Sequence, residues 1–298
     1  MLRYYVFIFF YLIYSGAMSS YILTVTCPDQ SGIIAAITNC IASNKGNIIN
    51  LAQHTAVDIG MFFCRVVFVS QDGFDQADFQ KEFGKVGEQF SMKWHIFNRG
   101  IKKRVAILVS KTSHCLYELL LKHADGELDC EIPVIISNHS ELAHIATSFH
   151  IPFFQVDTDK GKEEYEKDLE EILRQYNIEL VILARYMQVL SPDFCSRWNN
   201  RVINIHHGFL PAFKGAKPYH QAWQKGVKII GATGHFATAD LDQGPIIFQD
   251  VIRVADTCSV EEFTRMGKDV ERRVLYESVR RYLSHSIFFY NGRTFIIE

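Results

Sequence analysis

Short runs in which apolar and polar residues alternate dominate the first third of the chain. These runs are rich in β-branched and aromatic residues, and they predict strands at 21–27, 47–57, 62–70 and 92–97. Apolar residues at helical spacing predict helices at 33–45 and 75–90. The order strand, helix, strand, strand, helix, strand is typical of a ferredoxin-like βαββαβ domain.

The rest of the chain alternates apolar strands with amphipathic helices. The pattern predicts strands at 104–110, 132–137, 152–156, 180–184 and 202–206, and helices at 114–123, 140–149 and 162–176. A β-pair at 229–238 and 245–254, a helix at 259–283 and a hairpin at 287–297 around Asn291-Gly292 complete the prediction. Alternating strands and helices indicate an α/β fold, with a mostly parallel, Rossmann-like sheet covered by helices on both faces.

Two segments mark the limits of these domains. Residues 99–103 form a polar, charged connector, so we predict one domain at 18–98 and a second at 104–298. Residues 1–17 hold an apolar run that is shorter than the roughly 20 residues needed to span a bilayer. A mis-called start codon before Met18 is the interpretation we favour. A cleaved signal segment ending at Ser15-Gly16-Ala17 and genuine extra structure are the alternatives.

Composition narrows the function classes. The formal net charge of -2 argues against a protein that binds nucleic acid by neutralising phosphates. The seven cysteines are scattered, and no two have C-x-x-C spacing, which argues against a disulfide framework or a structural zinc site. We therefore expect a cytoplasmic protein with no membrane partner.

Candidate catalytic groups gather after two predicted strands. Asn204 and His206 lie two apart at the end of the strand 202–206, so both side chains point to one face and could bind one developing oxyanion. A loop with Asp240 and Asp242 follows the strand 229–238, and its carboxylates could orient the imidazole or accept a proton. His206 and His235 could instead bind a metal, but we expect none because no third ligand has metal-site spacing.

Four motifs in order carry a family resemblance. N-I-H at 204–206, L-P at 210–211, G-x-T-x-H at 231–235 and L-D-x-G-P-I at 241–246 resemble the formyltransferase fold that uses 10-formyltetrahydrofolate. The resemblance implies that Asn204, His206 and Asp242 are the catalytic set. The segment 183–194 resembles the stretch that holds the pteridine. The folate contacts implied there and in the 239–242 loop are Met187, Gln188, Val189, Leu190, Ala239 and Asp240.

Further motifs distinguish members of this family. Residues 110–115 read S-K-T-S-H-C where glycinamide ribonucleotide transformylases have a glycine-rich phosphate loop. The first domain resembles an ACT domain, which implies effector contacts at Asp29, Ser31 and Gly32. Together these features resemble formyltetrahydrofolate deformylases, although Gly208 and Lys214 replace the serine and the apolar residue that the pattern favours.

The resemblance implies a hydrolase that converts 10-formyltetrahydrofolate and water to tetrahydrofolate and formate, supplying formate for purine synthesis and balancing one-carbon pools. Asp242 would act as general base, directly or by orienting His206, while Asn204 and protonated His206 would bind the oxyanion. No cofactor or metal is expected. Methionine or glycine is the expected effector, and a homo-oligomer through ACT domains the expected assembly.

Three alternatives stay open at this point. One is a formyltransferase to an amine acceptor, which shares the catalytic set. Another is a non-catalytic amino-acid sensor whose second domain is a scaffold. The third is a secreted or membrane-anchored protein, which takes the apolar run in residues 1–17 at face value. A nucleophilic Cys115 finds little support, because His114 and Cys115 are adjacent at a helix start and point different ways, and no third group is evident.

Overall fold

The structure is a computed structural model that describes residues 19–212 and 217–298. The interpretation of residues 1–17 and the departure at Lys214 fall outside the described residues. The chain divides into two compact units. The first is built on residues up to Ile101 with Ile296–Glu298, and the second on Lys102–Phe295.

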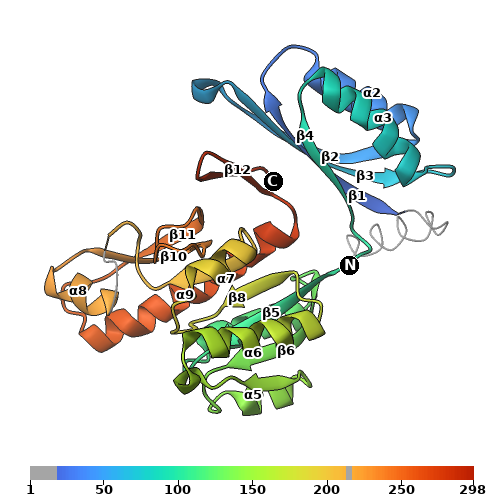
Figure 1. Ribbon diagram of the computed structural model, residues 1–298. Coiled ribbons are helices and arrows are strands. Elements are labelled where there is room, and N and C mark those ends of the chain that lie inside the picture. The colour runs from blue at the N-terminus through green and yellow to red at the C-terminus, as the bar shows by residue number, and fades with distance from the viewer. Residues whose placement is uncertain (1–18, 213–216) are drawn as a thin grey trace, which may run out of the picture. The chain divides into compact units, whose positions relative to one another are not determined.

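The first unit is a four-stranded antiparallel sheet with two helices on one face (Figure 1). Its strand order is β2-β3-β1-β4, and the predicted βαββαβ order is confirmed. The elements are β1 (Ser20–Pro28), α2 (Ile33–Ser43), β2 (Gly46–Ala56), the 3-10 turn Val57–Ile59, β3 (Met61–Ser70), α3 (Gln76–Gln89) and β4 (Lys93–Asn98).

Alternation along β1 explains the core of this unit. Leu23, Val25 and Cys27 point toward the helices and are buried, as are Phe79 and Phe83 of α3. Asp75 caps α3, because its carboxylate accepts hydrogen bonds from the backbone N–H groups of residues 77 and 78.

The second unit is built on a seven-stranded sheet in the order β11-β10-β9-β8-β5-β6-β7. Strands β9, β8, β5, β6 and β7 are parallel, whereas β10 and β11 are antiparallel. The strands are β5 (Lys103–Val109), β6 (Cys130–Ser137), β7 (Phe153–Gln155), β8 (Leu180–Leu183), β9 (Val202–His206), β10 (Ile229–Phe236) and β11 (Ile246–Arg253). The predicted α/β class is confirmed.

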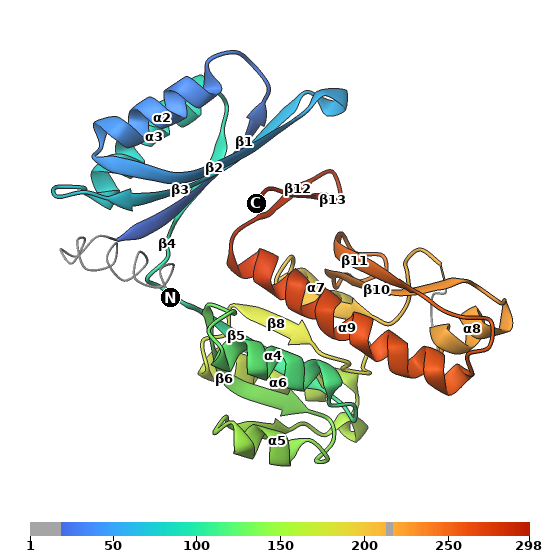
Figure 2. The same ribbon diagram turned by 180° about the vertical axis from the view of Figure 1, so that it is seen from behind.

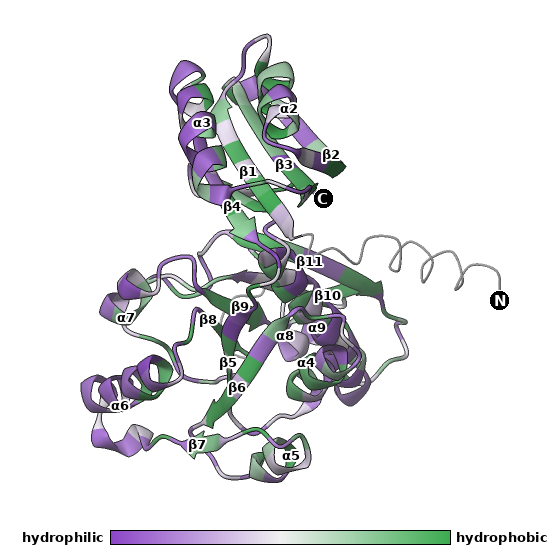
Figure 3. Cartoon of the chain, turned by 90° about the vertical axis from the view of Figure 1, so that its right-hand side faces the viewer, coloured by the Kyte–Doolittle hydropathy of each residue, from purple (hydrophilic) through white to green (hydrophobic). Residues whose placement is uncertain are grey.

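Helices cover both faces of this sheet. Helices α4 (His114–Ala124) and α9 (Val260–Leu283) lie on one face, and α6 (Lys162–Gln175) and α7 (Pro192–Arg197) lie on the other (Figures 1 and 2). Because both faces are buried, β8 is apolar at every position, and so is β5 from Val105 onward, rather than at alternate positions. Figure 3 shows the contrast between the largely hydrophilic α6 and the largely hydrophobic β6.

Two short helices were not predicted from the sequence. Both α7 and α8 (Pro218–Gln224) begin with proline, which fits the first helical turn, and neither is long enough to show a clear apolar period. Helix α5 (Ala143–Ser148) is shorter than predicted, and the 3-10 turn Thr158–Lys160 and the hairpin of β12 (Ile287–Tyr290) and β13 (Arg293–Ile296) complete the fold. Within residues 19–212 and 217–298, no helix combines the length and apolar character needed to cross a membrane.

Candidate active site

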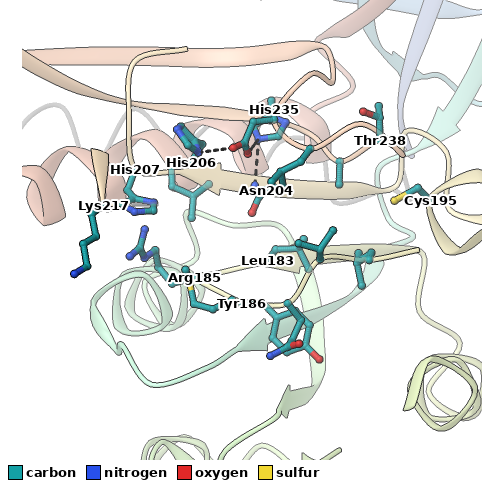
Figure 4. A pocket seen from close by; sticks show the side chains of 18 residues that line it. Leu183, Arg185, Tyr186, Cys195, Asn204, His206, His207, Lys217, His235 and Thr238 are labelled. Atoms are coloured by element: carbon teal, nitrogen blue, oxygen red, sulfur yellow. Dashed lines mark hydrogen bonds and ion pairs between the residues drawn. The ribbon is translucent and has the colours of Figure 1, made fainter. Parts of the chain in front are cut away.

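The register of β9 and β10 brings Asn204 against His235. The two residues are directly paired across these antiparallel strands. The amide Nδ2 of Asn204 lies 3.1 Å from Nε2 of His235 (Figure 4). The other ring nitrogen of His235 lies 2.9 Å from the carbonyl oxygen of Phe236. Since a carbonyl only accepts, Nδ1 of His235 donates and Nε2 accepts from Asn204. One N–H of the Asn204 amide is therefore left for a ligand.

The loop after β10 brings Asp242 close to His206 and His235. A side chain at Gly244 would put its Cβ 1.7 Å from the carbonyl oxygen of Phe236, so only glycine allows this return. Asp242 has φ 57°, a left-handed conformation that Asp tolerates better than most residues. Its Oδ2 lies 3.1 Å from Nδ1 of His206, and its Oδ1 lies 3.7 Å from Nε2 of His235.

The surroundings of Asp242 keep its carboxyl group ionised. Burial acts to raise its pKa, but the pKa is held well below its usual range, chiefly because of the hydrogen bond with His206. A carboxylate with so low a pKa is a weak base. Of the two roles predicted for Asp242, the geometry thus favours orienting His206 over accepting a proton directly.

His206 presents its other nitrogen to a ligand. The residue is 4% exposed, and among the described residues its buried Nε2 has no hydrogen-bond partner. Because Nδ1 faces Asp242, Nε2 is the atom available for proton exchange at the cavity that His206 lines.

A cavity of about 490 Å³ opens over these groups. Asn204, His206 and Asp242 line it, as do the predicted folate contacts Met187, Gln188, Val189 and Leu190. The predicted contacts Ala239 and Asp240 are not among the lining residues, because Thr238 and Leu241 of the same loop take that place. Gly208 does not line the cavity either, and its carbonyl oxygen accepts a hydrogen bond from Thr233. The volume is typical of sites for small heterocyclic ligands.

Sequence reasoning missed a charged network beside the cavity. The carboxylate of Glu271 on α9 is 1% exposed and faces three donors: Nε2 of His114 at 2.9 Å, the hydroxyl of Tyr219 at 2.8 Å and Nε of Arg185 at 3.4 Å. Burial raises the pKa of Glu271, but the contacts with His114, Arg185 and Tyr219 outweigh it and lower the pKa. The one signal in the sequence that could have revealed this network is an acidic residue, Glu271, at a core-facing position of the amphipathic helix α9.

His114, Cys115 and Glu271 bring their potential metal ligands within 4.8 Å of one another. The Glu271 carboxylate is already engaged by three donors. Burial holds the pKa of the Cys115 thiol well above its usual value, so the thiolate that a metal ion or a nucleophilic role requires is disfavoured. The cluster is best described as structural.

The predicted effector residues lie in the first unit. Asp29, Ser31 and Gly32 are all exposed, and Gly32 has φ 92° at the start of α2. The hydroxyl of Thr55 lies 3.5 Å from the Asp29 carboxylate. A separate polar cavity lined by Ser43, Lys45 and Asp75, among others, lies at the opposite end of α2.

His207 leads to a prediction about acid stability. Burial and the charge of Arg185 lower the pKa of His207 from 6.5 to about 3. Between these values the unfolded chain binds a proton that the folded chain does not, so stability is lost as pH falls. We expect His207→Asn to reduce the slope of unfolding free energy between pH 6.5 and 4, by up to about 1.4 kcal/mol per pH unit. Denaturant titrations at several pH values test this. A slope unchanged in His207→Asn would contradict it, and exposed His144→Asn is the control.

Comparisons with known proteins agree with this arrangement. The family described as Formyl transferase matches residues 103–279, and the ACT domain family matches residues 21–74. The formyltetrahydrofolate deformylase of Synechocystis sp. is 46% identical over 277 residues, covering 92% of this chain and 97% of that protein. That of Bacillus subtilis is 42% identical over 279 residues, covering 93% of both.

A solved structure extends the agreement to the whole fold. The crystal structure of a formyltetrahydrofolate deformylase from Pseudomonas syringae pv. tomato matches with a TM-score of 0.90 and 40% identity, covering 99% of both chains. These matches confirm the family resemblance predicted from the motifs. With an ACT domain followed by a formyl transferase domain, the chain belongs to the formyltetrahydrofolate deformylase family.

Proposed function

We propose that this protein hydrolyses 10-formyltetrahydrofolate to tetrahydrofolate and formate. The observation that carries the proposal is the convergence of Asn204, His206 and Asp242 on one cavity whose walls include Met187 and Leu190. Relatives that match 92% and 93% of this chain are named formyltetrahydrofolate deformylase.

The groups in the cavity suit attack of water on the formyl carbon. Nε2 of His206 accepts a proton from the water while Asp242 holds the opposite ring nitrogen. The water oxygen bonds to the formyl carbon, and the second N–H of Asn204 donates to the oxygen that gains negative charge.

Collapse of this intermediate completes the reaction. The bond between the formyl carbon and N10 breaks, and N10 gains the proton that His206 received from water. The formic acid released loses its own proton, so the products are formate, tetrahydrofolate and one proton. We propose that these steps need only water and the side chains of Asn204, His206 and Asp242, without a metal or a redox cofactor.

The direct test is incubation of the protein with 10-formyltetrahydrofolate and no amine. We expect formate and tetrahydrofolate in equal amounts, at a rate that added amines do not raise. A requirement for an amine, with appearance of an N-formyl product, would instead establish a formyltransferase. The release of formate by such a hydrolase would serve purine synthesis and one-carbon balance.

We also propose that the first unit senses an amino acid, methionine or glycine, through Asp29, Ser31 and Gly32. Support comes from the match to the ACT domain family and from the exposure of this turn. Calorimetry with each amino acid tests the proposal, and absence of heat with both would overturn it. We further propose that the protein forms a homo-oligomer through these domains and that it is located in the cytoplasm.

A further inference from the structure

Arg185 lies beside the catalytic imidazole. Leu183 at the end of β8 pairs with Asn204 of the parallel strand β9. Two residues further along each chain, Arg185 and His206 follow at the same edge of the sheet, and both line the cavity. Arg185 has φ 64°, a left-handed conformation that is unfavourable for a residue with a long side chain. Such backbone strain persists only where surrounding contacts hold it, and it is concentrated at functional sites.

Glu271 is the group that holds Arg185. Its Oε2 lies 3.4 Å from Nε of Arg185, and its other contacts come from α4, through His114, and from α8, through Tyr219. The Tyr219 ring packs directly on Gly267, where the Cβ of any other residue would lie 2.1 Å from it. Gly267 and Glu271 are four residues apart and share one face of α9. Helices α4, α8 and α9 thus fix the carboxylate, which forms an ion pair with Nε of Arg185.

The opposite side of the guanidinium is left for a ligand. Within residues 19–212 and 217–298, the buried Nε and Nη1 of Arg185 have no hydrogen-bond partner, and the 3.4 Å contact of Nε with Glu271 is an ion pair only. A buried donor without a partner is costly, and the cost is greater for a charged group. Figure 4 shows the Arg185 guanidinium directed toward His207, with Lys217 on the same side of the cavity and the Asn204–His235 pair farther away. Arg185 and Lys217 therefore bring two cationic side chains to this side of the cavity.

Small carboxylates are the ligands that such a group recognises best. A guanidinium offers planar paired N–H groups that match the two oxygens of a carboxylate. His207 is neutral near pH 7, since its pKa is about 3, and can donate one further hydrogen bond. Lys217 adds positive charge at the same wall.

We propose that Arg185, held by Glu271, forms a carboxylate site beside His206 that receives the formate released by hydrolysis. This proposal rests on the proposed function for the identity of the anion. Hydrolysis converts a neutral formyl group into an anion next to His206, where Arg185 can stabilise it. The glutamate tail of the substrate carries the same chemical group, but the position of Arg185 beside His206 favours formate.

Binding of formate tests the site without requiring turnover. Carbon-13 formate is titrated into the protein saturated with tetrahydrofolate, with chloride keeping the ionic strength constant, and line broadening gives the dissociation constant. We expect Arg185→Gln to weaken formate binding at least tenfold and Arg185→Lys to weaken it less. The control is Arg197→Gln, which removes an exposed arginine paired with Glu170 outside the cavity and is expected to bind formate as the wild type does.

A second experiment distinguishes formate from the glutamate tail of the substrate as the carboxylate that Arg185 binds. KM is measured for 10-formyltetrahydrofolate and for the analogue that lacks glutamate. If Arg185 bound the tail, Arg185→Gln would raise KM only for the substrate with glutamate and would leave formate binding unchanged, which would overturn the proposal. Equal formate binding by wild type and Arg185→Gln would also overturn it.

If Arg185→Gln does not fold, the folded Arg185→Lys must still bind formate more weakly than the wild type. If the protein binds formate through Arg185 but does not hydrolyse 10-formyltetrahydrofolate, the formate site stands and only the proposed function is refuted.

Discussion

Asp242→Asn is expected to lower kcat for formate release about 10³- to 10⁴-fold. The substitution keeps the size of the side chain but removes the charge that faces Nδ1 of His206 at 3.1 Å. An amide can turn its N–H toward the ring and stabilise the tautomer with the proton on Nε2, which cannot accept a proton from water. Losses of about 10⁴-fold accompany the same change in Ser-His-Asp enzymes, where the carboxylate has this orienting role.

The measurement is single-turnover formate release by Asp242→Asn, with folate affinity determined separately. Asp240→Asn is the matched control, because Asp240 belongs to the same loop but is exposed and does not line the cavity. We expect it to retain wild-type activity within a few-fold. A loss of less than tenfold for Asp242→Asn would show that His206 does not depend on this carboxylate.

The framework of the site could be predicted because it follows from local pattern. Alternation of apolar strands and amphipathic helices indicated the parallel sheet, and the spacing of Asn204 and His206 placed both at a carboxyl end where such sheets bind ligands. The loop after the strand 229–238 offered Asp240 and Asp242 as candidates, and the family motif selected Asp242. Its approach to His206 depends on the return of the loop at Gly244, which spacing alone does not reveal.

The residues that support the site could not be predicted in the same way. Glu271 lies in an amphipathic helix rich in charged residues, and only the packing of α4, α8 and α9 shows that it is buried. Arg185 follows an apolar strand in a left-handed conformation that no sequence rule assigns to arginine. His235 was considered as a metal ligand, whereas the register of β9 and β10 makes it the partner of Asn204.

Asn204→Ala is expected to lower kcat about 10²- to 10³-fold with little change in folate affinity. The amide is the neutral donor available to the developing oxyanion, and loss of one such donor typically costs about this much. The effect should fall on kcat, because the interaction strengthens only as negative charge develops in the transition state.

Formate release and tetrahydrofolate binding are measured side by side for Asn204→Ala. Asn199→Ala, which alters an exposed residue after α7, serves as control and is expected to match the wild type. Equal activity of wild type and Asn204→Ala would show that Asn204 does not stabilise the oxyanion. Absence of activity in the wild type itself would favour a non-catalytic sensor.

The central claim is that Asn204, His206 and Asp242 act together on one formyl group. The most direct measurement is a crystal structure of the protein with a folate whose N10 carries a formyl-like group that cannot be hydrolysed. We predict the pteridine against residues 187–190, the carbonyl oxygen within roughly 3 Å of the Asn204 amide, and Nε2 of His206 within reach of the attacking water. A folate bound outside this cavity, or bound in it with N10 directed away from His206, would show that these three residues do not act together on the formyl group.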